Sequence, residues 1–253
     1  MWKSCSTVIN TGVTNSGMLN TIVCGDCVGG MKSLDNNSVD LVFTSPPYNC
    51  GNKGKNKDMY KFYSDNLTNE QYLNLLDESL HESLRICKGL VFYNLNFMRN
   101  NTSTLLEFLF RNKDVLRDIM VWDKMRVQPP IGNILGKRCE FIFIFSKDPK
   151  TVINDFRNNK ATKYKDVFGS WLSNICQIGI KTDKIDAKLH RAGFPVDLPK
   201  IFIDMYTEPG GVVLDPFMGC GATAMAAKAL NRHYIGYELN KEYVDIANKR
   251  LYG

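Results

Sequence analysis

The sequence predicts an α/β protein with a three-layer, Rossmann-like fold, in which a mostly parallel sheet of seven strands lies between two layers of helices. Apolar segments with strand character recur along the chain, and helical patterns lie between most of them, which is typical of such sheets. The chain has 253 residues, of which 44% are hydrophobic, enough for one substantial core. We therefore expect a single domain over residues 1–253.

The segments expected to form strands are short runs rich in β-branched and aromatic residues. No helical pattern lies between the fourth and the fifth of them, so these two are expected to pair as an antiparallel unit at one edge of the sheet. The expected strands are Thr21–Cys24, Asp40–Thr44, Gly89–Leu95, Val115–Trp122, Cys139–Ser146, Gly211–Asp215 and Tyr234–Glu238.

Helices are expected where apolar residues recur at helical spacing. At the start of the longest one, Thr68 and Gln71 have the spacing of a capping box, which satisfies free backbone N–H groups. The expected helices are Val28–Leu34, Asn69–Cys87, Ser103–Asn112, Val196–Tyr206, Ala222–Leu230 and Lys241–Leu251.

Composition excludes several classes of protein. No apolar run approaches the ~18 residues of a membrane span, and the N-terminus lacks the apolar core of a secretory signal, so we expect an intracellular protein without a membrane partner. The eight cysteines are typical of small buried side chains in a reducing compartment. Cys24 and Cys27 form a C-x-x-C pattern, but no second pair accompanies it and the chain has only three histidines, so no metal site is expected.

Charge is concentrated in two polar segments. The net charge of +6 permits a polyanionic partner, although a charge of this size also simply keeps a protein soluble. Residues 50–66 are expected to form a flexible basic loop. Residues 147–188 are lysine-rich with weak periodicity, so they are either a small inserted module or a solvated excursion of the chain.

A nucleotide-type site is expected near the C-terminus. Val212–Ala227 contains a strand, a glycine turn and an alanine-rich helix, and its Gly219 and Gly221 fit the pattern G-x-G-x-x-A. Glu238 follows 19 residues after Gly219, at the end of the next expected strand, where a carboxylate can accept both hydrogen bonds of a ribose diol. These features together predict binding of an adenosine moiety.

Asp215 distinguishes between two adenosine cofactors. NAD, the cofactor of hydride-transfer enzymes, needs a helix start aimed at its pyrophosphate, which the Asp215 carboxylate would repel. The same carboxylate can receive the cationic amino group of a methionine moiety, while Phe217 supplies an apolar wall. S-adenosylmethionine therefore fits better than NAD.

A second unusual segment follows the strand that ends at Thr44. Pro46 and Pro47 cannot donate to a sheet or enter a helix interior. Ser45–Tyr48, hereafter the S-P-P-Y loop, is therefore expected to be a rigid loop at a strand end.

These segments resemble the S-adenosylmethionine-dependent amino-methyltransferases that act on DNA. Thr44–Asn49 resembles their [DNS]-P-P-[YFW] motif, and Asp215–Gly221 resembles their D-P-F-x-G-x-G cofactor motif. The first motif precedes the second, as in the permuted beta group of these enzymes. The resemblance covers residues 20–251, with Arg191 and Cys220 in place of the family's usual proline and serine. It implies a circularly permuted methyltransferase domain.

The resemblance implies a role for each residue of the loop. Such an enzyme flips a base out of the duplex, and Tyr48 is the platform on which that base stacks. Ser45 and the carbonyl of Pro46 accept hydrogen bonds from the exocyclic amine, and Pro47 leaves no competing N–H beside that carbonyl. Alignment of the amine with the sulfonium methyl group then lowers the barrier, and direct transfer needs no metal.

By the same resemblance, the cofactor lies at the carboxyl ends of three neighbouring strands. An acidic residue in a segment similar to the family's G-D element contacts the adenine edge, and a second acidic residue contacts the ribose. The residues expected to contact the cofactor or shape its pocket are Asp26, Thr44, Asp215, Phe217, Gly219, Gly221 and Glu238.

The implied partner is double-stranded DNA. The basic loop and the 147–188 segment are candidates for phosphate contact and for sequence reading. A recognition segment of only about forty residues favours a short recognition sequence, or help from a second subunit in a homodimer.

The resemblance favours N4 of cytosine over N6 of adenine as the target. Ser45, rather than aspartate, begins the S-P-P-Y loop, and Phe194 stands where adenine-modifying relatives usually carry lysine. Three other hypotheses stay open: an N6-adenine methyltransferase, an NAD-dependent dehydrogenase, and a nucleic-acid-binding module that has lost catalysis.

Overall fold

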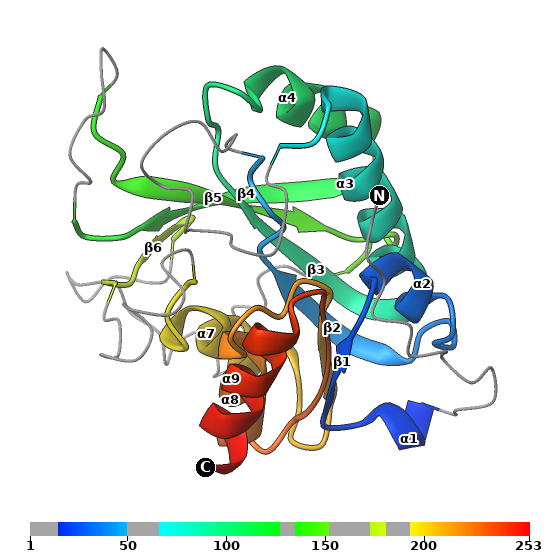
Figure 1. Ribbon diagram of the computed structural model, residues 1–253. Helices are drawn as coiled ribbons and strands as arrows, with labels where there is room; N and C mark the ends of the chain where they lie inside the picture. The colour runs from blue at the N-terminus through cyan, green and yellow to red at the C-terminus, as the bar shows by residue number, and fades with distance from the viewer. Residues whose placement is uncertain (1–14, 50–65, 127–134, 152–172, 181–192) are drawn as a thin grey trace.

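The computed structural model describes residues 15–49, 66–126, 135–151, 173–180 and 193–253. Its strands form one sheet in the order β1-β8-β7-β2-β3-β5-β4-β6 (Figure 1). The strands are β1 (Thr21–Cys24), β2 (Val39–Thr44), β3 (Cys87–Leu95), β4 (Leu116–Asp123), β5 (Cys139–Phe145), β6 (Ile175–Gln177), β7 (Val212–Asp215) and β8 (His233–Glu238).

Strand direction agrees with the prediction of a mostly parallel sheet. β5 is antiparallel to its neighbours β3 and β4, and every other pair is parallel. Among the described residues the sheet has eight strands rather than seven, because the short β6 pairs with β4 and forms the edge. β6 lies within the predicted 147–188 insertion, of which residues 152–172 and 181–188 are outside the described residues, as are residues 50–65 of the basic loop.

Helices cover both faces of the sheet, so the fold has three layers as predicted (Figure 1). α2, α3 and α4 cover one face, and α7, α8 and α9 cover the other. The described helices are α1 (Asn15–Met18), α2 (Cys27–Met31), α3 (Asn69–Ile86), α4 (Thr102–Arg111), α7 (Asp197–Tyr206), α8 (Ala222–Ala229) and α9 (Lys241–Tyr252).

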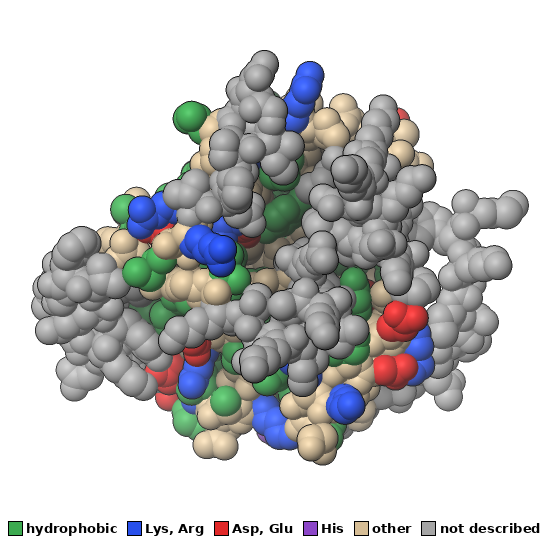
Figure 2. Space-filling view, turned by 60° about the vertical axis from the view of Figure 1, so that its left-hand side comes forward, with side chains coloured by type: hydrophobic (Ala, Val, Ile, Leu, Met, Phe, Trp, Pro, Cys, Tyr) green, Lys and Arg blue, Asp and Glu red, His purple; other side chains and the backbone are tan. Residues whose placement is uncertain are grey.

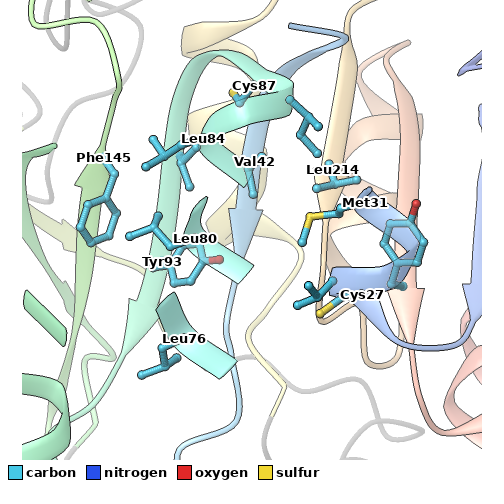
Figure 3. Close-up of a cluster of buried hydrophobic side chains, with 14 of the residues drawn as sticks. Cys27, Met31, Val42, Leu76, Leu80, Leu84, Cys87, Tyr93, Phe145 and Leu214 are labelled. Carbon is cyan, nitrogen blue, oxygen red and sulfur yellow. The ribbon is translucent and has the colours of Figure 1, made fainter. Parts of the chain in front are cut away.

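The alternation of side chains along β3 divides the core into two clusters. Tyr93 points to the α3 side, where Leu76, Leu80 and Leu84 form a stripe at helical spacing (Figure 3). These side chains are all buried, with Tyr93 fully so. The predicted capping box is also present: the backbone N–H of Thr68 donates to the side chain of Gln71 at 3.1 Å, and the backbone N–H of Gln71 donates to the side chain of Thr68 at 3.2 Å.

On the opposite face, aromatic rings from the sheet pack against α7. Phe202 of α7 lies 5.3 Å from Phe43 and 4.9 Å from Phe92, measured between ring centroids. Because Phe92 and Tyr93 are consecutive on β3, they fill opposite faces of the sheet. This packing fixes the positions of the two strands, β2 and β3, that carry the candidate site.

The strand order places the predicted site residues together at the end of the sheet that is formed by the carboxyl ends of its parallel strands. β8, β7 and β2 are consecutive neighbours, and hydrogen-bonded strands lie ~4.8 Å apart. The carboxyl ends at Glu238, Asp215 and Thr44 are therefore adjacent. No helix among the described residues is long and apolar enough to cross a membrane.

Candidate active site

The S-P-P-Y loop follows the carboxyl end of β2, and side-chain amides hold it in place. Asn101 Nδ2 donates to the backbone oxygen of Tyr48 at 2.7 Å. Asn49, in the left-handed region at φ 51°, exchanges two hydrogen bonds with the backbone of Leu67, at 2.8 and 3.0 Å. The two prolines restrict the φ angles of the loop, and these hydrogen bonds attach its backbone to neighbouring segments.

The side chains of Ser45 and Tyr48 meet in one polar network. The Tyr48 hydroxyl donates to Glu140 Oε2 at 2.7 Å, and Ser45 Oγ, 3.2 Å from that hydroxyl, donates to the backbone oxygen of Asn94 at 3.1 Å. Asn94 Nδ2 also donates to Glu140 Oε2 at 2.7 Å and to the hydroxyl oxygen of Tyr48 at 2.9 Å. The network therefore fixes both polar side chains of the loop.

Register explains why these residues come together. Asn94 follows Phe92 on the same face of β3, Glu140 precedes Ile142 on β5, and Lys124 follows Trp122 at the end of β4. Trp122 and Glu140 are directly paired across the sheet. Each polar residue thus continues an apolar row to the carboxyl end of β3 or β4, where the S-P-P-Y loop lies.

Asp215, the last residue of β7, links the end of β2 to the glycine turn. Its carboxylate has no exposed surface and accepts from Thr44 Oγ1 at 2.6 Å, from Thr223 Oγ1 at 2.6 Å and from Phe217 N at 3.0 Å. Burial raises the pKa of Asp215 to about 6, against the opposing effect of these donors. Because the carboxylate is fully buried and already accepts three hydrogen bonds, direct contact with a cationic amino group stays a prediction.

The glycine turn is fastened to the end of β8. Glu238 accepts from the backbone N–H of Gly219 at 2.9 Å and from that of Asn240 at 2.8 Å, and burial raises its pKa. Gly221 caps α8 at φ 85°, and a Cβ atom there would lie 2.9 Å from Ala247 Cβ. Only glycine fits this position without strain.

Asp26 lies beside Glu238, because Cys24 of β1 is paired with Glu238 of β8. Its side chain caps α2 by accepting from Gly29 N at 2.6 Å. The structure therefore brings together all the residues predicted to bind the cofactor, on the ends of four consecutive strands, β1, β8, β7 and β2.

These residues fit an adenosine cofactor. A carboxylate offers about four lone-pair positions, and the two backbone donors on Glu238 leave acceptor capacity for a ribose diol. No cluster of three or more metal-ligating side chains occurs in the part of the chain that the structure describes.

An ion pair organises the neighbouring end of β4. Arg138 binds Asp123 through two hydrogen bonds of 2.6 and 2.7 Å, which lower the pKa of Asp123 to about 2. Arg138 and Arg126 are exposed. Figure 2 brings the β4–β6 side forward and shows Lys and Arg side chains there beside hydrophobic ones.

The fold and the site together define the class of the protein: a three-layer α/β domain whose candidate site lies at the carboxyl ends of adjacent parallel strands. The model of the DNA methylase family of N6 and N4 methyltransferases matches residues 39–249. This chain therefore belongs to that family, which confirms the predicted DNA amino-methyltransferase.

Individual relatives agree with this assignment. Type II methyltransferase M.HinfI of Haemophilus influenzae is 33% identical over 92% of this chain and 68% of its own length. Type II methyltransferase M.BglII of Bacillus subtilis is 30% identical over 93% of this chain and 69% of its own length.

Solved structures confirm the fold. The cytosine-N4-specific PvuII DNA methyltransferase matches with a TM-score of 0.72 and 23% identity, over 92% of this chain and 86% of its own. M1.HpyAVI, solved in complex with S-adenosylmethionine, matches with a TM-score of 0.62 and 25% identity, over 92% of this chain and 99% of its own.

Several residues of the site were not predicted from the sequence: Asn94, Asn101, Lys124 and Glu140. The sequence does show single polar residues within otherwise apolar strands. In Cys139–Phe145, for example, one glutamate stands among phenylalanine and isoleucine residues. That signal does not tell which strands are neighbours.

Proposed function

We propose that this enzyme transfers a methyl group from S-adenosylmethionine to the exocyclic amine of a base flipped out of double-stranded DNA, with N4 of cytosine as the target. The observation that carries the proposal is the 2.6 Å hydrogen bond between Thr44 and Asp215, which joins the end of β2, just before the S-P-P-Y loop, to the end of β7, just before the glycine turn. A base on the loop and a cofactor on the turn are then neighbours.

Each group of the loop has a defined task. S-adenosylmethionine supplies the electrophilic methyl group. Tyr48 stacks the flipped base, while Ser45 Oγ and the Pro46 carbonyl accept hydrogen bonds from its amine. Because these acceptors are fixed in advance, they hold the amine nitrogen in the orientation for in-line attack, and no covalent enzyme intermediate is needed.

The cofactor is held by two carboxylates and the turn. Glu238 accepts from the ribose diol, and Asp26 contacts the adenine edge. Phe217 and the two glycines shape the pocket, and Asp215 keeps the turn and Thr44 in register through its three internal hydrogen bonds.

The DNA lies against the face that carries the strand ends. Exposed Arg126 and Arg138 at this face are suited to phosphate contact, and residues 50–66 and 147–188 are the segments assigned to phosphate contact and sequence reading. A homodimer would enlarge this surface.

Cytosine is favoured by the resemblance, because Ser45 rather than aspartate begins the S-P-P-Y loop and Phe194 stands where adenine-modifying relatives usually carry lysine. An N6-adenine target requires the same acceptors and the same alignment. The target base therefore has to be identified from the methylated nucleoside that the enzyme produces.

The test is transfer of a labelled methyl group from S-adenosylmethionine to unmethylated DNA. Wild-type protein should label the DNA, and Tyr48→Ala should label it at least roughly tenfold more slowly, while both bind the cofactor. Failure of the folded wild-type protein to label any DNA would overturn the proposal and favour a binding module without catalysis.

A further inference from the structure

A buried ion pair lies behind the hydroxyl of Tyr48. Lys124 Nζ donates to Glu140 Oε1 at 2.8 Å, and the two side chains are only 3% and 12% exposed. The other oxygen, Glu140 Oε2, accepts from the Tyr48 hydroxyl and from Asn94 Nδ2, each at 2.7 Å. One carboxylate therefore receives three donors, one of which belongs to the S-P-P-Y loop.

Stability does not account for this pair. Taking two charges out of water is costly, and replacing a buried pair by apolar side chains of similar volume is often neutral or stabilising. The preceding position on the Lys124 face of β4 is Trp122, and the following one on the Glu140 face of β5 is Ile142, both buried. Apolar side chains at positions 124 and 140 would extend this buried face of the sheet, so the two charged side chains need an explanation other than stability.

Base stacking alone does not account for the tyrosine hydroxyl. A phenylalanine would offer a ring face of the same size, without an O–H group to satisfy. Here the hydroxyl reaches a carboxylate that Lys124 and Asn94 already hold in place. At the other end of the residue, Asn101 holds the backbone oxygen of Tyr48 at 2.7 Å. Both ends of Tyr48 are thus anchored.

We propose that Glu140, held by Lys124, is a positioning residue that sets the ring plane of Tyr48 before the target base arrives. The inference rests on the proposed function, in which Tyr48 is the stacking platform. A ring fixed in advance loses little freedom when the base binds, and its plane decides whether the amine meets the acceptors of the loop. Glu140 itself does not touch the substrate.

A double-mutant cycle between Tyr48→Phe and Glu140→Gln tests the proposal. Glutamine has one acceptor oxygen where the carboxylate has two. The charged donor Lys124 should keep that oxygen, which turns the amide NH2 group toward the Tyr48 hydroxyl and removes its acceptor. Each single variant should lower kcat for methylation of unmethylated DNA by roughly tenfold to a hundredfold, since a displacement on the order of 1 Å can cost that much. The double variant should be no slower than the slower single variant, because both changes remove the same contact.

Cofactor affinity separates positioning from general damage. Calorimetric Kd values for S-adenosylhomocysteine should stay within about twofold of wild type in all three variants, because the contact lies on the base side of the site. Lys124→Met combined with Glu140→Leu removes both charges at once, so it should fold and still show the loss in kcat. Glu82→Gln is the matched control: it breaks a 2.8 Å ion pair with Arg85 on α3 and should leave kcat unchanged.

The outcomes distinguish this inference from the proposed function. If wild-type protein labels DNA, Tyr48→Ala labels it much more slowly, and either Tyr48→Phe or Glu140→Gln keeps full kcat, the positioning role is wrong while the function stands. Losses that multiply in the double variant would also overturn it. If wild-type protein labels no DNA, it is the proposed function that fails.

Discussion

At the scale of single residues, Asp215 has an unusual environment for an acid. It is an acid without exposed surface, and burial raises its pKa from 3.8 to about 6. Between these two pH values the folded protein holds a proton that the unfolded chain has released. The stability that Asp215 contributes is therefore fully present below about pH 4 and is lost as the pH rises through about 6.

Asp215→Asn should remove this pH dependence. The amide oxygen can accept from Thr44 and Phe217, and the amide nitrogen can donate to the Thr223 hydroxyl, so the contacts persist. Relative to wild type, the variant should gain free energy of unfolding between about pH 4 and pH 7, by on the order of 2–3 kcal/mol. Urea denaturation across this range measures the difference, and a difference that does not change with pH would contradict the assigned pKa.

Two alanine substitutions should separate the two halves of the site. Tyr48→Ala removes stacking worth ~1–3 kcal/mol per base, so it should lower the methylation rate by roughly tenfold or more with cofactor affinity unchanged. Glu238→Ala removes hydrogen bonds to a carboxylate and should weaken cofactor binding by at least roughly tenfold. Calorimetry and rate assays on both variants measure this, and equal loss of cofactor affinity in both would mean that the two subsites are misassigned.

At the scale of elements, the absence of a side chain at Gly221, the N-cap of α8, allows the glycine turn to pack closely against α9. Gly221→Ala places a Cβ at φ 85° and 2.9 Å from Ala247 Cβ. The free energy of unfolding should fall by roughly 1–3 kcal/mol. Gly179→Ala is the control, because nothing lies within 4 Å of its added Cβ, and it should change stability by less than about 0.5 kcal/mol. Equal denaturation midpoints for the two variants would contradict the packing of α8 on α9.

The longer elements were predictable because their patterns are local. α3 shows its capping box and apolar stripe within one segment, and its end at Ile86 differs by one residue from the prediction because β3 begins at Cys87 without a turn. α1 and β6 were missed, since four and three residues are too few to show a period.

Contacts between distant segments could be predicted only where a motif implied them. The glycine turn and Glu238 belong to one strand–helix–strand unit, so their proximity followed from spacing. Glu140 and Asn94 are 46 positions apart and meet because β5 inserts between β3 and β4, a strand order that local pattern does not encode.

At the scale of the whole molecule, the strand order makes one site from distant parts of the chain. β1 brings Asp26, β2 brings the S-P-P-Y loop, and β7 and β8 bring the glycine turn and Glu238 to a single edge. Such a site should bind an adenosine cofactor without a pyrophosphate. S-adenosylhomocysteine at 100 times its Kd should stabilise the protein by ~2.7 kcal/mol in a thermal-shift or denaturation experiment. Stabilisation by NAD alone would restore the dehydrogenase hypothesis.

The most direct test of the central claim is to identify the methylated nucleoside. Unmethylated DNA is incubated with the protein and S-adenosylmethionine carrying a labelled methyl group, digested to nucleosides and resolved by mass spectrometry. Methyl transfer to an exocyclic amine is expected, with N4-methylcytosine as the labelled product, formed at least roughly tenfold more slowly by Tyr48→Ala. A product containing only N6-methyladenine would refute the cytosine target alone, whereas DNA with no labelled amine would contradict the account of this site as an amino-methyltransferase.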